Sequence, residues 1–355
     1  MDMKICVLAG GRSTERNVSI SSGTRITQAL REAGHQATFV DLFLGYDMSG
    51  VQDVNDVFGD ANLIDGLAIS DAVLTDDDIN ALRTDGSTQL FGPGVLEIAQ
   101  AADIVYLALH GGDGENGKVQ AYLDLNNIRY TGSGALASGL TMNKVFSKQI
   151  MLESGIPTAK FKEALRKDGT HQQMPFNFPM IVKPTSGGSS VGMTIAHDAS
   201  ELEAGLAEAF RFDPSAIVEE FITGREFSLG VVNGVAMPAI EIKVHDGWYD
   251  FEHKFQPGHT DFVTPPDDLD ESIHQEMKDV AQATMRALDL QNYARIDFFV
   301  TPDDKVYVIE ANNLPGMTPL SLLPQEAEAA GIKYSELVDS IVRGKMDLYD
   351  QGLAI

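Results

Sequence analysis

The sequence predicts an α/β protein in which a Rossmann-like N-terminal domain precedes two domains of mixed strands and helices. Residues 4–42 run strand, glycine turn, long helix and strand, an order typical of a parallel sheet. Beyond Pro157 the pattern changes to strands and hairpins with one helix between them, at about residues 199–210. With 355 residues, the chain has enough length for two or three domains.

In the first domain the long helix is expected to end at Gly34, and the next strand to cover residues 37–42. The dinucleotide-binding pattern GxGxxG is absent, so this fold does not indicate a dinucleotide site. Residues 41–90 hold eleven aspartates, no lysine and one arginine, which predicts a solvated acidic insertion. Residues 102–117 then resume the pattern as a buried strand and a glycine-rich loop. A short helix follows, and then a further helix that ends near Gly155.

The later elements are bounded by apolar runs and turn residues. We expect strands at 178–183, 191–195 and 217–221, a hairpin at 293–312, and helices at 271–290 and 334–349. The changes in pattern place domain boundaries near 132 and 218. The predicted domains are 1–132, 133–218 and 219–355.

Composition excludes several classes of partner. The net charge of −26 argues against binding to nucleic acid or to anionic membrane surfaces, because both attract basic patches. Cys6 is the only cysteine, so no intrachain disulfide and no cysteine-rich metal site is expected. With no secretory leader and no apolar run of membrane-spanning length, a cytoplasmic protein is expected.

The most specific pattern is the hairpin at 293–312, whose turn is expected at residues 301–304. Centring the turn between its two aspartates predicts three cross-strand pairs: Asp297 with Glu310, Arg295 with Asn312, and Phe299 with Val308. Directly opposed carboxylates repel each other, and apolar neighbours argue against a solvated face. A hard divalent cation resolves the conflict, since Mg²⁺ prefers carboxylates and substrate phosphates as ligands. The hairpin therefore predicts a magnesium site.

A second pattern, KPTSGGSSVGM at residues 183–193, joins two predicted strands. It is not a P-loop, because the lysine precedes the glycines and no helix follows. Backbone N–H groups and hydroxyls of such a loop suit an oligophosphate, with Lys183 as a point charge. The strand IVEEF at 217–221 suits a nucleotide base, with Glu219 and Glu220 at its end and Glu226 within reach of a ribose. Together with the magnesium pair, these features predict an ATP site.

These motifs resemble the ATP-grasp superfamily and, within it, the D-alanine–D-alanine ligases. The resemblance covers nearly the whole chain and rests on GGRSTERNVS, LHGGDGENG, YTGSGALASGLTMNK, IVKPTSGGSSVGM, RIDFFV and EANNLPGMTPLSL. It implies a substrate-binding first domain and two domains that hold ATP between their sheets. In this family ATP phosphorylates the carboxylate of one D-alanine, and the amine of a second then attacks the acyl phosphate.

The resemblance also implies a role for each matching residue. Nucleotide binding falls to Lys144, Lys183, Ser190, Glu219, Glu226 and Lys254, with Lys254 reaching the γ-phosphate. Two Mg²⁺ ions, replaceable by Mn²⁺, would be held by Asp297, Glu310 and Asn312. Arg295 and the backbone N–H of Gly316 would stabilise an oxyanion. Substrates would meet Glu15 at the first ammonium, Ser189, His110 and Phe255, with Ser321 near the second carboxylate. A homodimer is also implied.

One position departs from the family pattern. A tyrosine typically follows the Lys254 position, on a loop that closes the site, whereas Phe255 stands there in this chain. The missing hydroxyl removes a partner from Ser189 and Glu15, and a lost hydrogen bond shifts discrimination by roughly 1–3 kcal/mol. We therefore expect D-lactate as the second substrate and D-alanyl-D-lactate as the product, for peptidoglycan synthesis. The alternative is an ordinary ligase making D-alanyl-D-alanine, and the remote one a non-catalytic nucleotide-binding module.

Overall fold

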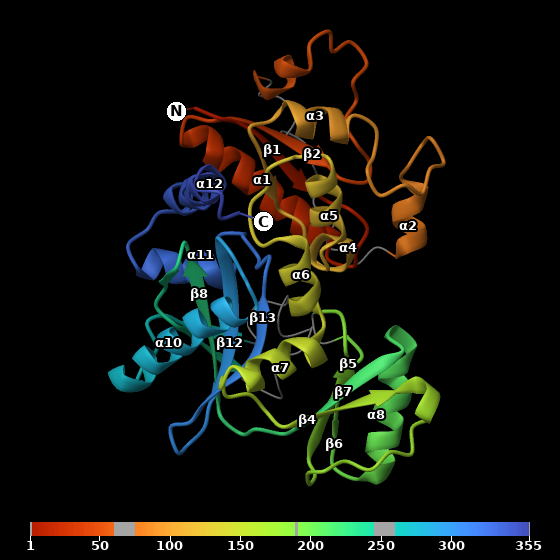
Figure 1. Ribbon diagram of the computed structural model, residues 1–355, viewed down its shortest axis with the longest axis vertical. Helices are drawn as coiled ribbons and strands as arrows, with labels where there is room; N and C mark the ends of the chain where they lie inside the picture. Colours follow the sequence, from red (N-terminus) through yellow and green to blue (C-terminus); the bar gives the residue numbers. More distant parts are fainter. Residues whose placement is uncertain (1, 60–74, 189–190, 245–259, 355) are drawn as a thin grey trace.

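The computed structural model describes residues 2–59, 75–188, 191–244 and 260–354, and it forms three sheets with helices packed around them (Figure 1). Four predicted site residues lie outside the described residues: Ser189, Ser190, Lys254 and Phe255. None of the described helices combines the length and the apolar character needed to cross a membrane.

The N-terminal sheet is parallel, as predicted, with strand order β2-β1-β3. Its strands are β1 (Lys4–Ala9), β2 (Gln36–Asp41) and β3 (Ile104–Leu107). Helix α1 (Arg16–Glu32) connects β1 to β2, and the chain leaves the helix through Gly34 at φ +93°. This is a left-handed backbone conformation that favours glycine, so the sequence stops the helix there.

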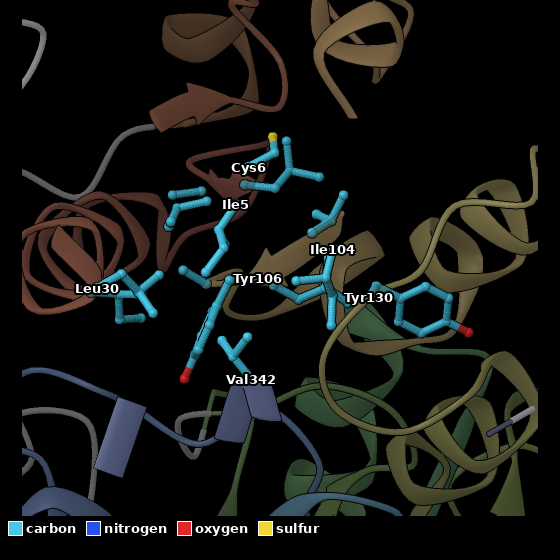
Figure 2. Packing of buried hydrophobic residues seen from close by; sticks show 14 of the residues in the cluster. Ile5, Cys6, Leu30, Ile104, Tyr106, Tyr130 and Val342 are labelled. Carbon is cyan, nitrogen blue, oxygen red and sulfur yellow. The ribbon is translucent and has the colours of Figure 1, made fainter. Parts of the chain in front are cut away.

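The core of this sheet is a continuous apolar layer (Figure 2). Residues 5–9 of β1 are fully buried, because helices cover both faces of a parallel sheet and alternation disappears. Val342 reaches the same core from α12 (Tyr334–Asp350), which packs against α1 although about 300 residues separate the two helices in the chain. The C-terminal helix thereby fastens the first domain to the last.

The acidic stretch is not simply a solvated insertion, which corrects the prediction. Short helix η1 (Val54–Gly59) buries Val57 and Phe58 in the N-terminal core. Asp41 forms a buried ion pair with Arg16. The stretch ends before α3 (Val95–Ala101), and its part at 60–74 lies outside the described residues. Among the described residues of the stretch, a few apolar side chains between aspartates anchor η1 to the N-terminal core.

Four short helices connect the first sheet to the second. They are α4 (Gly112–Glu115), α5 (Lys118–Leu125), α6 (Ala135–Met142) and α7 (Lys144–Glu153), while α2 (Asp76–Ala81) lies within the acidic stretch. The helix predicted to end near Gly155 is α7, whereas α6, which precedes it, was not predicted. They are divided at Asn143, which leaves the helical conformation and whose side chain accepts the Phe146 N–H at 3.0 Å. This cap fixes the start of α7 and thus the direction of its lysines.

The middle sheet is antiparallel with order β4-β7-β5-β6, and α8 (Ala199–Phe212) covers one face. Its strands are β4 (Phe161–Leu165), β5 (Met180–Pro184), β6 (Thr194–Ala196) and β7 (Ser215–Glu220), and η2 (Arg166–Asp168) follows β4. Strand β6 begins three residues later than the predicted start at 191. The proposed boundary at 218 falls inside β7, which stays with this sheet up to Glu220.

The third sheet has strand order β11-β10-β8-β12-β13, with β9 paired to β8. Its strands are β8 (Arg225–Val232), β9 (Val235–Ala236), β10 (Ile240–Val244), β11 (Thr260–Val263), β12 (Tyr293–Val300) and β13 (Val306–Asn312). Helix α10 (Glu271–Ala287) packs on one face of this sheet. Helix α11 (Leu322–Ala329), which follows the hairpin in the chain, contacts β8. The mixed α/β fold with several sheets agrees with the prediction.

Candidate active site

The polar hairpin face forms as predicted at its central positions. Asp297 on β12 pairs with Glu310 on β13, and Arg295 pairs with Asn312. Arg295 donates two hydrogen bonds of 2.9 Å to the two carboxylate oxygens of Asp297. Asn312 Nδ2 donates to the same carboxylate at 3.0 Å. Two opposed carboxylates, an amide and a guanidinium therefore meet on one sheet face.

The predicted pairing fails one residue further along the hairpin. The register shifts between Asp297 and Phe298, so Phe299 faces Tyr307 and Val308 faces Phe298. A bulge of this kind accommodates one extra residue on one strand. It is stabilised because β13 is an edge strand, where Val308 N–H donates instead to Pro157 O at 2.8 Å. The bulge lies next to the carboxylate pair and turns the following side chains to the other face.

Three lysines converge on this region, two from helix α7 and one from strand β5. Lys144 Nζ donates to Gly187 O and lies 4.0 Å from Glu310 Oε2. Lys183 Nζ and Lys148 Nζ flank the Glu219 carboxylate at 2.9 and 3.0 Å. Burial opposes charge on Lys183, but the carboxylates of Glu219, Glu310 and Glu226 outweigh it and raise its pKa. A cationic cluster therefore exists in this strongly acidic protein, beside the candidate carboxylates.

Glu15 lies where the glycine loops approach each other. A Cβ at Gly111 would come within 2.7 Å of Glu15 Oε2, so the two loops approach closely, and φ +70° at Gly111 is a conformation that favours glycine. A Cβ at Gly188 would lie 3.9 Å from the same oxygen. Gly188, in the loop after Lys183, therefore lies close to the Glu15 carboxylate.

His110 and Glu115 follow β3 in the predicted glycine-rich segment. Leu314 O can only accept a hydrogen bond, so His110 Nδ1 carries the proton at 3.2 Å and Nε2 accepts from Ser22 Oγ at 3.0 Å. Burial lowers the pKa of His110, which keeps this link neutral. Glu115 was not named as a site residue, although the motif LHGGDGENG that contains it was singled out. Burial, and then the nearby Glu15 carboxylate, raise its pKa to about 8.

Gly316 and Ser321 lie side by side after β13. A Cβ at Gly316 would approach Ser321 Oγ at 2.8 Å, and this hydroxyl also lies 2.8 Å from Thr318 Oγ1. Ser321 is the N-cap residue of α11, although its side chain makes no capping hydrogen bond. The Gly316 backbone and the Ser321 hydroxyl therefore lie side by side in the segment before α11, and a backbone N–H beside a hydroxyl suits a carboxylate or an oxyanion.

A narrow slot, partly open to solvent, lies between the middle sheet and the C-terminal hairpin. Its apolar lining comes from both sheets and from the segment after β7, and it includes Ile181, Ile222, Phe299 and Ile309. Lys148 and Glu219 form its polar end. A flat base between aliphatic and aromatic walls, with a carboxylate acceptor at one end, fits this lining. Glu226 lies on β8 opposite Phe299, next to the slot.

Two further charged residues near the site were not predicted, Lys148 and Glu326, and both are buried. Lys148 had a signal in the sequence: it follows Lys144 by four residues, which places both on one helix face. Glu326 on α11 had none. It is fully buried, accepts the Gly230 N–H at 2.5 Å, and burial raises its pKa to about 8.

The carboxylate pair fits a hard cation. Across the part of the chain that the structure describes, no group of three or more acidic, histidine or cysteine side chains is placed to hold a metal. A cation bound by Asp297 and Glu310 would therefore need the Asn312 amide oxygen and oxygens from a ligand. Mg²⁺ is bound in this way, through one or two carboxylates and substrate phosphates. The adjacent lysines supply the place for those phosphates.

Comparisons with known proteins agree with this geometry. Residues 4–133 match the family described as D-ala D-ala ligase N-terminus, and residues 150–343 match D-ala D-ala ligase C-terminus. A D-alanine–D-alanine ligase of Lacticaseibacillus casei is 69% identical over 351 residues, covering 99% of this chain and 98% of that protein. One of Pediococcus pentosaceus is 65% identical, covering 98% and 99%.

Solved structures give the same fold. The D-alanine–D-alanine ligase of Bacillus anthracis in complex with ATP superposes with a TM-score of 0.73 at 28% identity, over 99% of both chains. That of Coxiella burnetii has a TM-score of 0.76 at 27% identity, over 99% of this chain and 96% of that one. The similarity therefore extends along nearly the whole chain.

Proposed function

The chain belongs to the D-alanine–D-alanine ligase family, and from this premise we propose that it is an ATP-dependent enzyme that joins two D-alanine molecules. One observation carries the proposal. Glu15 at the start of α1, the glycine loop after β5, Lys144 at the start of α7 and the Asp297–Glu310 pair of the hairpin lie close to one another in sequence-distant elements. Such convergence of an ammonium site, a phosphate site and a cation site suits ATP-driven activation of an amino acid.

The first step forms an acyl phosphate. The carboxylate of the first D-alanine attacks the γ-phosphorus of ATP, and ADP leaves. Glu15 holds the ammonium of that substrate, while Lys144 and Lys183 attract the phosphates. Mg²⁺, held by Asp297, Glu310 and Asn312, would neutralise phosphate charge when bound. Arg295, fixed by its two hydrogen bonds to Asp297, keeps its guanidinium directed along this sheet face.

The second step forms the peptide bond. The neutral amine of the second D-alanine attacks the acyl carbon, the carbonyl electrons move onto oxygen, and phosphate leaves as the amine loses a proton. We assign stabilisation of that oxyanion to Arg295 and the Gly316 N–H, and binding of the second carboxylate to Ser321, next to Gly316. The dipeptide is a precursor suited to peptidoglycan. A cytoplasmic homodimer is part of this proposal.

D-Lactate is a second candidate for the acceptor, and Phe255 favours it. The phenylalanine lies outside the described residues, at a position where family members typically carry a tyrosine. The two relatives that are 69% and 65% identical are named for the dipeptide product, which favours D-alanine. Both acceptors follow the same first step and differ only in the attacking atom.

Competition between the two acceptors tests this choice. With ATP, Mg²⁺, D-alanine and D-lactate together near neutral pH, we expect D-alanyl-D-alanine as the main product by mass spectrometry. The Phe255→Tyr variant is expected to move the product ratio further towards the dipeptide by roughly tenfold, since one hydrogen bond in a closed site is worth about 1 kcal/mol or more. Mostly D-alanyl-D-lactate from the unaltered enzyme would reverse the assignment of the acceptor.

A further inference from the structure

We propose that Lys148 is a positioning residue for nucleotide recognition, which holds the Glu219 carboxylate ionised and in place at the base end of the slot. The inference rests on the proposed use of ATP and extends it to a residue that touches no phosphate. It begins from burial: the side chain of Lys148 is 2% exposed and that of Glu219 is 4% exposed. Charges removed from water to this extent require defined partners.

The contacts of Lys148 tie together the two walls of the slot. Its ammonium lies 3.0 Å from Glu219 on β7 and donates to Thr158 Oγ1 at 2.6 Å. Thr158 in turn donates to Val308 O on β13 at 2.8 Å. Lys148 therefore connects the middle sheet to the C-terminal hairpin at the point where the slot is lined by Lys148, Glu219 and Val308. Its ammonium therefore links a carboxylate of one wall, through Thr158, to the backbone of the other.

The two lysines of helix α7 point to different parts of the nucleotide site. Lys144 and Lys148 are one turn apart on the same face, because four residues nearly complete a turn. Lys144 points to Gly187 and Glu310, on the side of the phosphate loop, while Lys148 points to Glu219. The helix thus spans the nucleotide site from its phosphate end to its base end.

Charge balance explains why Glu219 has two lysines. Burial alone would raise the pKa of Glu219, but Lys148 and Lys183 lower it, so the carboxylate is ionised. When Lys183 binds nucleotide phosphates, its positive charge interacts with the phosphates as well as with Glu219, so it compensates the Glu219 charge less. Lys148 then remains as the partner that keeps the charge of Glu219 compensated. Without it, a buried carboxylate would take up a proton or move.

The position of the carboxylate has a consequence for base selection. Glu219 Oε1 contacts Lys148 as an ion pair, yet it accepts no hydrogen bond of adequate geometry from the described residues. An ionised oxygen of this kind accepts from the exocyclic amino group of adenine and repels the carbonyl oxygen of guanine. Lys148 therefore supports the preference for ATP over GTP through Glu219.

The test separates nucleotide recognition from general damage. Lys148→Met is expected to raise KM for ATP by about 10- to 100-fold, which is the range for a charge-assisted hydrogen bond lost from a buried site. The ratio of kcat/KM for ATP to that for GTP should fall by about the same factor. KM for D-alanine and kcat should change less than about threefold. Lys148→Arg should restore part of the loss. The matched control is Lys160→Met, since that lysine is 76% exposed and pairs with the neighbouring Glu220.

Two further results decide the outcome. The double variant Lys148→Met/Glu219→Gln removes both charges, so it should fold even if the single variant does not, and its KM for ATP should be no worse than that of Glu219→Gln alone. Unchanged ATP affinity in Lys148→Met, or equal loss in kcat and in both KM values, would overturn the inference. Absence of ATP-dependent ligation in the unaltered protein would instead overturn the proposed function.

Discussion

Replacing Asp297 with asparagine is expected to abolish ligation, with a loss of roughly 1,000-fold or more in kcat, equivalent to about 4 kcal/mol. The side chain keeps its size, but the charge opposite Glu310 and beneath Arg295 disappears. Arg295 then loses the anion that accepts two of its hydrogen bonds, and a cation site loses one of two carboxylates. Product release and ADP formation with saturating D-alanine measure the effect.

The control for this variant lies in the same hairpin. Asp303 is exposed at the turn, where it pairs with Lys305 at 2.7 Å, so Asp303→Asn should leave kcat within about twofold. If Asp297→Asn keeps the unfolding temperature and the ADP affinity of the unaltered protein, the loss of activity lies in the chemical step. Activity within tenfold of the unaltered protein would remove Asp297 from the site, and unaltered protein with no turnover at all would favour a nucleotide-binding module.

The hairpin illustrates what sequence patterns predict well. A four-residue turn with two aspartates fixes the register of the strands on either side, so the pairing of Asp297 with Glu310 followed from counting. The bulge one residue later could not be predicted in this way. It depends on Val308 bonding to Pro157, a residue about 150 positions away in the chain. Local register is encoded locally, whereas its interruption is set by a tertiary contact.

Buried charges were the other source of error. Lys148 and Glu326 look like ordinary polar helix residues in the sequence, because a helical pattern does not tell which polar residue has a partner inside. Their partners, Glu219 and Gly230, come from other elements. In the acidic stretch the error was reversed: Val57 and Phe58 are core residues that the surrounding aspartates obscured. Composition averages over a segment, but burial is decided residue by residue.

Replacing Lys345 with methionine is expected to stabilise the protein at pH 7. Lys345 on α12 has no exposed surface, and its ammonium lies 3.0 Å from Gln291 Oε1 and over the rings of Tyr130 and Tyr349. Burial lowers its pKa from 10.5 to about 8. Methionine fills a similar volume between the aromatic rings and removes the cost of burying a charge, which exceeds the lost contacts.

The sign of the pH dependence follows from the direction of this shift. Between about pH 8 and 10.5 the unfolded chain holds a proton on Lys345 that the folded protein has released, so unfolding takes up a proton and stability rises with pH. Below about pH 8 both states are protonated and the cost is constant. A depression of about 2.5 units corresponds to roughly 3 kcal/mol, the largest change expected across this range.

The difference in unfolding free energy between Lys345→Met and the unaltered protein therefore depends on pH, and urea titrations measure it. At pH 7 we expect the variant to be more stable by about 1–2 kcal/mol, after allowance for the lost cation–π contacts and hydrogen bond. Towards pH 10 the advantage should vanish or reverse, because the unaltered lysine is then neutral in the folded state. Lys160→Met, at an exposed lysine, should give a difference that is flat with pH. If the difference for Lys345→Met is also flat with pH, the ammonium is solvated because the contact between α12 and the N-terminal sheet opens. In that case α12 does not hold the first domain to the last.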